Sequence, residues 1–427
     1  MKAPYAILFV AITCCVMRLL TERSSSLLPV RADKPLLVVV LMVKNEATVI
    51  CQTLQPFVDA GVQHYFILDT GSTDNTVDVV TNYFSENNIT HARVAQEPFV
   101  DFAASRNRAL ALAEQQFADA EFMVMLDAEW YLQRADVLLE FCRENRNDVH
   151  DAFLLRIASG ELDFYLPRLV RPRAQLRFIG AVHEHLEIET AKKVPAGVCF
   201  EVRPAQHGQD ATKKRLLRDL DILLQEYAKD PDNTRTIYFL AQTYVSLGNL
   251  IEAYYFFRSC VARTEINKDT SYWKIEQAYQ ASYHAGVIAL ELSKTNASFT
   301  WQVAHDHFIY AFSITPCRAE PLVRVAQHYW DEKNMPLCFI FARHAAELPY
   351  PEHATGLVEK DVYHFKRYDL LGACAGNIGR WDVAEWATRK ALEAAPHKEH
   401  LHKNLAIILQ KKVAAQVVAP QTNHYEL

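Results

Sequence analysis

The chain has 427 residues, of which 50% are hydrophobic and 22% are charged. This length allows more than one domain with its own core, and this composition is typical of folded rather than disordered chains. The formal net charge of −6 argues against a nucleic-acid-binding protein, because such proteins present a basic surface to the phosphates. A glycine-rich phosphate loop would stand out among only 12 glycines, and the sequence contains none.

A short apolar segment lies near the start of the chain. Residues 5–17 are mostly apolar and are flanked by Lys2 and Arg18. This run has the length of a signal-peptide core, whereas a spanning helix needs about 20 residues. We therefore expect residues 1–34 to be a signal peptide, or a type II membrane anchor with a short stem. The protein would then be lumenal in the secretory pathway, anchored in the ER or Golgi or secreted, with a cytosolic location as the alternative.

Two further features bear on the compartment. The triplets Asn88-Ile89-Thr90 and Asn296-Ala297-Ser298 have the sequence of N-glycosylation sites and predict a glycoprotein. The nine cysteines form no CxxC pair and show no zinc-site spacing, so we expect them to be small buried residues. Disulfide pairing among them stays open.

From residue 35 the sequence alternates between strand and helix patterns. Continuous apolar runs predict buried strands at "LLVVVLMV", "HYFILD" and "FMVML", with a shorter strand around residues 92–95. Helical patterns occupy residues 47–60, 75–84 and 103–117 between them. Such strand-helix-strand units predict a mostly parallel sheet with helices on both faces. Ligands of these sheets bind beyond the carboxyl ends of the strands.

Acidic residues follow three of these predicted strands. Glu46 comes after the first strand, Asp69 ends the second, and Asp127 and Glu129 follow the fourth. No GxGxxG motif follows the first strand, so a dinucleotide cradled by glycines is not expected. A diphosphate held through a hard divalent cation fits better, because carboxylate oxygens are the ligands that such cations prefer.

Four segments, in this order, resemble those of a known enzyme family. "MVKNEATVI", "ILDTGSTDNTVDVV", "DFAASRNRALALA" and "FMVMLDAEWYL" are similar to the inverting family 2 glycosyltransferases with the GT-A fold. "RLVRP" and "FIGAVHEHLEI" resemble the acceptor-side segment of the branch with C-terminal helical repeats. The resemblance covers residues 35–215 and implies an enzyme that moves a sugar from a nucleotide-sugar donor.

The resemblance also implies roles for individual residues. The base and ribose of the nucleotide sugar would be held by one group of residues, to which an Arg-Asn pair adds a further contact. These residues are Asn45, Glu46, Asp69, Gly71, Ser72 and Asp74, with Arg106 and Asn107 as the Arg-Asn pair.

The family's Asp-x-Asp matches Asp127-Ala128-Glu129, with Glu in place of the second Asp. By resemblance a Mn or Mg ion would be bound by Asp127, Glu129 and His183. Whether Glu129 replaces the second Asp or only Asp127 reaches the metal stays open. Glu184 is the expected general base that deprotonates the acceptor, with Asp163 as the alternative.

The second half of the chain has a helical repeat pattern. Residues 230–261 and 368–396 carry small and aromatic residues where tetratricopeptide (TPR) units have them, and residues 318–346 form a degenerate unit. Unequal spacing predicts insertions between the units. "TPCRAEPL" resembles a segment of the repeat-bearing branch. The concave face of such an array commonly binds an extended partner, so a protein or peptide acceptor is one candidate ligand of the repeats.

These patterns together predict an α/β GT-A domain over residues 35–215 and an all-α TPR-like domain over residues 216–427. The predicted function is a metal-dependent inverting glycosyltransferase of the hexosyl- or N-acetylhexosaminyl-transferase class, acting on an unknown acceptor. The alternative is a catalytically degenerate scaffold that binds a nucleotide sugar and recruits a partner protein through its repeats. The Asp-Ala-Glu departure keeps this alternative open.

Overall fold

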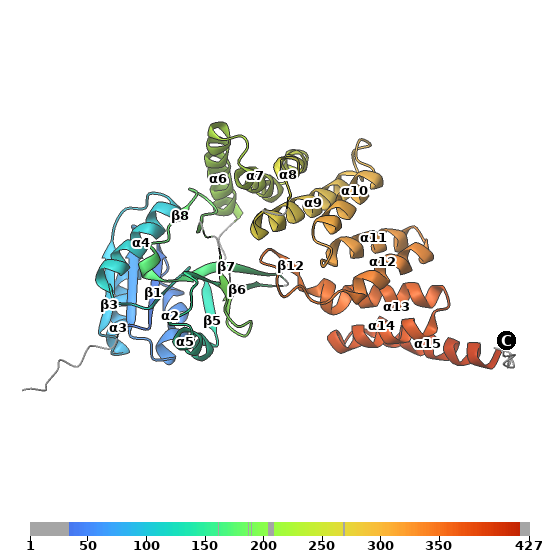
Figure 1. Cartoon of the computed structure of the whole chain (residues 1–427), viewed down its shortest axis with the longest axis horizontal. Helices are drawn as coiled ribbons and strands as arrows, with labels where there is room; N and C mark the ends of the chain where they lie inside the picture. Colours follow the sequence, from blue (N-terminus) through green and yellow to red (C-terminus); the bar gives the residue numbers. More distant parts are fainter. Residues whose placement is uncertain are drawn as a thin grey trace, which may run out of the picture.

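The computed structural model describes residues 34–418, except 161, 187, 189, 204–208 and 268–269. An α/β body occupies one side of the molecule, an arc of helices occupies the other, and the β6–β7 strand pair extends between them (Figure 1). The expected signal peptide or anchor lies outside the described residues. None of the helices within them combines the length and apolarity that crossing a bilayer requires.

Parallel strands form the first half of the main sheet, as predicted. They are β1 (Leu37–Val43), β2 (His64–Asp69), β3 (His91–Gln96) and β4 (Phe122–Leu126), in the order β3-β2-β1-β4. The central strand β1 aligns Val43 with Asp69 of β2 and Leu41 with Leu126 of β4. The carboxyl ends of β1, β2 and β4 therefore lie at one edge.

The continuous apolar sequence of β1 is explained by helices on both faces of the sheet. Val39 and Leu41 pack in the cluster that includes α2 (Ile50–Asp59), α3 (Thr76–Glu86) and α5 (Ala135–Glu144). Val38 and Val40 pack on the opposite face with α4 (Phe102–Gln116). Because alternate residues of a strand point to opposite faces, both sets must be apolar.

The second half of the sheet is mixed. The antiparallel pair β6 (Ala152–Ser159) and β7 (Leu162–Val170) joins it to β4, and β11 (Cys199–Val202) and β5 (Trp130–Gln133) complete the order β4-β7-β6-β11-β5. β10 (Lys192–Lys193) pairs with β6. After the 3₁₀ turn η1 (Pro172–Ala174), β8 (Phe178–Ile179) and β9 (His185–Leu186) form a separate two-stranded sheet.

The rest of the described chain is almost entirely helical, and neighbouring helices pack as antiparallel pairs along the arc (Figure 1). The helices are α6 (Gln209–Lys229), α7 (Thr234–Leu247), α8 (Leu250–Arg263), α9 (Tyr272–Leu292), α10 (Trp301–Ile314), α11 (Glu320–Asp331), α12 (Met335–Glu347), α13 (Arg367–Asn377), α14 (Trp381–Ala394) and α15 (Glu399–Val418). Gly248, with φ +82°, ends α7 and lets the chain reverse into α8. The predicted helical repeat architecture is confirmed.

The connection between α12 and α13 contains a strand that the sequence pattern did not predict. β12 (Val358–Glu359) pairs antiparallel with β7, placing Val358 opposite Asp163. In addition, Lys193 Nζ donates to the carbonyl oxygens of Glu352 and Ala354 at 2.5 and 2.8 Å. The helical half therefore adds an edge strand to the α/β sheet. A two-residue strand has no periodicity to detect, so it escapes pattern analysis.

A buried ion cluster holds the segment before β12 in the helical array. Arg318 donates to Glu276 at 2.5 Å, to Glu320 at 2.8 Å and to the carbonyl oxygen of Leu357 at 2.5 Å. Its guanidinium also lies 4.4 Å from the centroid of the Tyr279 ring. Arg318 and Glu320 belong to the "TPCRAEPL" segment, which thus fixes the strand that reaches the other domain.

The cysteines are mostly buried, as expected. Cys142, Cys199 and Cys260 are buried, Cys51 is half-buried and Cys317 is exposed. The structure also contains a disulfide whose two partners could not be predicted from the sequence. Cys338 of α12 and Cys374 of α13 form a disulfide with a Cα–Cα distance of 6.0 Å.

Candidate active site

Three acidic residues gather at the carboxyl ends of the parallel strands. Asp69 ends β2, Glu46 lies in the loop after β1, and Asp127 directly follows β4. The pKa of Glu46 is raised to about 7, first by burial and then by the negative charges of Glu129, Asp127 and Asp74. The strand-end carboxylates therefore interact, as the strand order requires.

Asp69 is the most deeply buried of these acids, with 0% of its surface exposed. Its Oδ1 accepts hydrogen bonds from the backbone N–H groups of Gly71 and Ser72, both at 3.1 Å. Gly71 has φ +100°, a conformation that favours glycine. Within the described structure, Asp69 Oδ2 is buried and has no hydrogen-bond partner. This leaves one carboxylate oxygen able to accept an N–H group from a ligand.

The loops after β1 and β2 are tied together by residues predicted to bind the nucleotide. Asn45 Oδ1 accepts from the Thr73 N–H at 2.7 Å, and the Asn45 N–H donates to Ser72 Oγ at 2.8 Å. Asp74 accepts from the hydroxyl and N–H of Thr76, the first residue of α3. These contacts shape the loop that follows Asp69. Nucleotide binding by Asn45, Ser72 and Asp74 stays a prediction.

The Asp127-Ala128-Glu129 segment is a turn between β4 and β5. The Trp130 N–H donates to the Asp127 carbonyl at 3.1 Å, and Thr53 of α2 donates its hydroxyl to the Ala128 carbonyl. The carbonyl of Glu129 accepts from the Arg203 N–H at 3.1 Å. The turn is therefore fixed on several sides and leads directly into β5. The Asp127 side chain is 32% exposed, so it faces an open site.

Arg106 of α4 connects Asp127 to the segment around residue 184. Its Nη2 donates to Asp127 Oδ1 at 2.5 Å, and its Nε donates to Glu184 Oε1 at 2.6 Å. The adjacent Asn107 exchanges two hydrogen bonds with the backbone of Phe178, at 2.8 and 2.7 Å. Arg106 thus lies in the site, whereas the Asn107 amide holds β8 against α4 and its predicted contact with the donor stays a prediction.

His183 and Glu184 point in opposite directions. Glu184 faces the site, where it pairs with Arg106 and, at 3.4 Å, with Arg168. His183 instead stacks on Phe239 of α7, with ring centroids 4.1 Å apart, and its carbonyl accepts from Arg235. The expectation that His183 binds the metal is therefore not met, because its ring faces the helical array.

Of the three predicted metal ligands, Asp127 and Glu129 lie near each other and His183 lies apart from them. Asp127 and Glu129 lie close enough to Glu46 to raise its pKa, and a cation would offset this concentration of negative charge. His183 does not join them. Throughout residues 34–418 as described, no three His, Cys, Asp or Glu side chains converge as a metal-binding group. The predicted ligand set is therefore not assembled as a whole, and cation binding by Asp127 and Glu129 stays a prediction.

The alternative general base, Asp163, lies elsewhere. It is only 3% exposed, accepts from Arg156 at 3.2 Å and pairs with Lys360 at 3.4 Å. It also lies opposite Val358 in the β7–β12 ladder. These contacts make Asp163 part of the junction between the sheet and the helical array, which argues against it as the base.

Arg168 is a residue of the site that was not predicted from the sequence. Arg168 lies on β7, is 6% exposed, and has its guanidinium 5.1 Å from the ring centroids of both Trp130 and Phe178. A signal was present in "YLPRLVRP", because an arginine inside a buried strand must have a specific partner. Which partner it finds is set by folding, since Glu184 lies 16 residues away.

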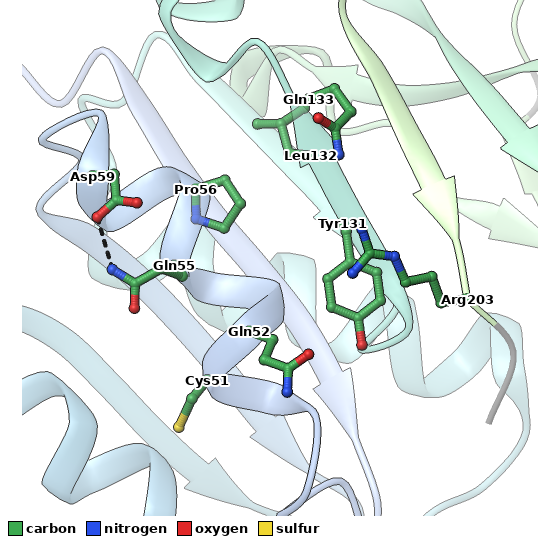
Figure 2. Close-up of a pocket in the computed structure, with 9 residues that line it drawn as sticks. All are labelled: Cys51, Gln52, Gln55, Pro56, Asp59, Tyr131, Leu132, Gln133 and Arg203. Atoms are coloured by element: carbon green, nitrogen blue, oxygen red, sulfur yellow. Dashed lines mark hydrogen bonds between the residues drawn. The ribbon is translucent and has the colours of Figure 1, made fainter. Parts of the chain in front are cut away.

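A separate groove lies between α2 and β5 (Figure 2), with a volume of about 470 Å³. It is lined by Cys51, Gln52, Gln55, Pro56, Asp59, Tyr131, Leu132, Gln133 and Arg203. Arg203 lies over the Tyr131 ring at 4.5 Å, and Gln55 donates to Asp59. None of the residues predicted to bind the donor or the metal lines this groove, so it is distinct from the carboxylate edge.

Comparison with protein-family models assigns part of the chain to a family. Residues 38–191 match the family model described as "Glycosyl transferase family 2". No curated protein matches the chain. Solved structures that resemble it include MamA, at 16% identity over 45% of this chain and 96% of that one, with a TM-score of 0.32.

Two other similar structures are described as TPR proteins. The C-terminal part of a TPR repeat-containing protein from Cytophaga hutchinsonii is 12% identical over 49% of this chain and 70% of that one, with a TM-score of 0.35. A thermophilic TPR protein from Thermus thermophilus is 20% identical over 47% of this chain and 94% of that one, with a TM-score of 0.29. Residues 38–191 of this chain are a glycosyl transferase family 2 domain, and TPR-like helical repeats follow it.

Proposed function

We propose that the protein is a metal-dependent inverting glycosyltransferase that moves a hexosyl or N-acetylhexosaminyl group from a nucleotide sugar to an acceptor. The observation that carries this proposal is the set of acidic residues at the strand ends of a family 2 domain, Glu46, Asp69, Asp127 and Glu129. They occupy the edge at which sheets of this kind bind ligands.

On the donor side, Asp69 is suited to bind the nucleobase. Its buried Oδ2, unpaired within the described residues, can accept a base N–H. Gly71 and Ser72 hold the other carboxylate oxygen and so fix its direction. Asn45, Glu46 and Asp74, also predicted to contact the nucleotide, lie in the loops after β1 and β2.

The divalent cation, Mn or Mg, would be held by Asp127 and Glu129. When bound, it would neutralise charge that develops on the departing diphosphate. Arg106 already holds Asp127 Oδ1 at 2.5 Å and thereby orients the carboxylate. His183 falls outside this proposed set, because its ring is stacked on Phe239.

On the acceptor side, Glu184 is the proposed general base. Both arginine contacts are made to its Oε1, so the proposed proton acceptor is Oε2. The acceptor oxygen or nitrogen attacks the anomeric carbon while its proton passes to Glu184. The bond from that carbon to the diphosphate oxygen breaks, and the nucleoside diphosphate leaves. A single displacement of this kind inverts the anomeric configuration.

The helical array is the proposed binding surface for the acceptor or for a partner, and a protein or peptide acceptor is one candidate. Two similar TPR structures carry titles that mention peptides, one an unusual peptide-binding site and the other a bound HSP90 peptide. This chain's array lies directly beside the proposed site, because His183 packs on Phe239 of α7.

We also propose a lumenal location in the secretory pathway, reached through a signal peptide or membrane anchor, and N-glycosylation of the protein. Asn88 is exposed in the turn after α3, and Asn296 lies in the turn before α10. The Cys338–Cys374 disulfide supports this compartment, since disulfides persist where the environment is oxidising.

A catalytically degenerate scaffold is the second candidate function. Two observations favour it: Glu replaces Asp in the Asp-x-Asp segment, and Arg106 already pairs with both Asp127 and Glu184. The deciding experiment incubates the purified protein with a panel of nucleotide sugars, with Mn²⁺, with Mg²⁺ or with a chelator. Cation-dependent release of nucleoside diphosphate supports the enzyme. Binding without release supports the scaffold, and neither binding nor release contradicts both.

A further inference from the structure

Two buried guanidinium groups meet at one carboxylate oxygen in the site. Arg106 and Arg168 both contact Glu184 Oε1, at 2.6 and 3.4 Å. Both also lie against Phe178, at 5.9 and 5.1 Å from its ring centroid. Like charges this close are unfavourable unless anions compensate them. Asp127 and Glu184 provide one negative charge for each guanidinium.

This arrangement leaves hydrogen-bonding capacity unused. Nη1 of Arg106 and Nη1 of Arg168 are both buried and have no hydrogen-bond partner among the described residues. A buried N–H group without an acceptor is costly, so such groups in a site point to a ligand that supplies acceptors. The ligand must bring oxygen atoms, because guanidinium groups only donate.

Arg168 is also held in a fixed orientation. Its guanidinium lies 5.1 Å from the ring centroids of Trp130 on one element and Phe178 on another. Such packing restricts the side chain before any ligand arrives, which lowers the entropic cost of binding. The adjacent Asp127 side chain is 32% exposed, so a ligand can approach this region from solvent.

Arg171, three residues further along the chain, is a buried arginine whose role is structural and with which Arg168 can be compared. It is 2% exposed and lies 4.6 Å from the Phe122 ring centroid, so its burial and stacking resemble those of Arg168. Its guanidinium, however, donates to the carbonyl oxygens of Asn145, Asp148 and His150 at 2.5, 3.2 and 2.9 Å. Arg171 is held by the protein itself, whereas Arg168 faces carboxylates and has one N–H donor group, Nη1, that no described residue accepts.

The geometry points to Arg168, acting with Arg106, as the binding site for the diphosphate of the donor. This inference rests on the proposed function, because it names which residues bind one part of the proposed substrate. Guanidinium groups bind phosphate oxygens through paired hydrogen bonds, and two of them suit a diphosphate. A diphosphate that arrives with a divalent cation brings charges of both signs, so the balance of the four ionised side chains is kept.

The test compares R168K with R171K. Lysine keeps the charge but loses the planar paired donors. UDP, GDP and dTDP are titrated into the full-length protein with Mn²⁺ by calorimetry. The matching nucleosides, which lack phosphate, are titrated by saturation-transfer NMR. We expect R168K to bind the preferred nucleoside diphosphate about 10- to 100-fold more weakly, with nucleoside binding unchanged. R171K should bind both ligands as the parent does.

The outcomes separate this inference from the proposed function. If the parent binds a nucleoside diphosphate and R168K binds it equally well, Arg168 is structural and the inference is wrong while the proposed function stands. Equal weakening of nucleoside and nucleoside diphosphate would also contradict it. If the parent binds none of the three diphosphates, the proposed function fails and the inference fails with it. Should R168K not fold, R106K tests the second guanidinium by the same criteria.

Discussion

The buried ion cluster around Arg318 allows a quantitative prediction about stability. Arg318 and Glu320 have side chains only 1% exposed, and the Glu276 side chain is 5% exposed. Replacing Arg318 with Met keeps a long unbranched side chain but leaves two buried carboxylates without their cation. Removing one partner of a buried ion pair typically costs about 3–5 kcal/mol. We therefore expect R318M to lower the free energy of unfolding by about that amount.

Thermal unfolding followed by circular dichroism measures this effect. For a domain of 150–250 residues, about 1 kcal/mol corresponds to a Tm shift of about 2–4 °C, so R318M should unfold roughly 6–20 °C below the parent. The matched control is R343M on α12, which removes an ion pair to Glu347 at 2.6 Å whose side chains are 45% and 51% exposed. Exposed pairs contribute about 0–1 kcal/mol, so R343M should stay close to the parent.

A second comparison isolates the buried charge itself. Adding E276Q and E320Q to R318M removes the uncompensated carboxylates, and the triple variant should regain part of the lost stability. A Tm for R318M within the range of R343M would refute this reasoning. So would a triple variant less stable than R318M, because the cost would then arise from packing rather than from charge.

Three further predictions follow from the site and the helical core. D127N should reduce donor hydrolysis roughly 100-fold or more, since cation stabilisation of the diphosphate amounts to several kcal/mol, while the Tm shows that the fold survives; activity that is unchanged in D127N or in chelator would exclude this metal site. E184Q should slow sugar transfer roughly 10²- to 10⁴-fold, and transfer at the parent rate would place the base elsewhere. Burial lowers the pKa of His284 to about 4; the charge of Glu359 raises this pKa by less, and that of Arg324 lowers it further. Protonation of His284 therefore favours the unfolded chain. The contribution of neutral His284 to the free energy of unfolding should therefore be fully present above about pH 6.5. The free energy of unfolding should fall by about 3 kcal/mol as the pH decreases to about 4. H284F should flatten the acid dependence of urea unfolding between these pH values, and an unchanged slope would assign the acid loss to other groups.

The strands and the acidic edge could be predicted because their causes are local. An uninterrupted apolar run such as Leu37–Val43 forms a strand buried on both faces, and parallel connectivity then brings Asp69 and Asp127 to one edge. Helix pairs were likewise visible from the spacing of small and aromatic residues. These features depend on neighbours in sequence, so a single sequence contains them.

The pairings within the site depend on contacts that no local pattern encodes. Glu184 meets Arg106 across 78 residues, and the direction of His183 is set by its φ of 51° and by Phe239 on a different domain. From the family resemblance, His183 was predicted to bind the metal. The segment itself shows neither its positive φ nor its contact with Phe239, so the sequence could not correct this prediction. The partner of Arg168 could not be predicted for the same reason, since its contact with Glu184 forms only in the folded chain.

The strand that the helical array adds to the sheet has a consequence for biosynthesis. About 155 residues of chain separate β11 from β12, and a ribosome adding about 5–20 residues per second needs roughly 8–30 s to make them. During that interval the end of β7 that later pairs with Val358 has an unpaired edge, which is a point of aggregation risk. A nascent chain stalled before Val358 would expose this edge for longer. Folding of the catalytic sheet is thus completed only once most of the repeats have left the ribosome.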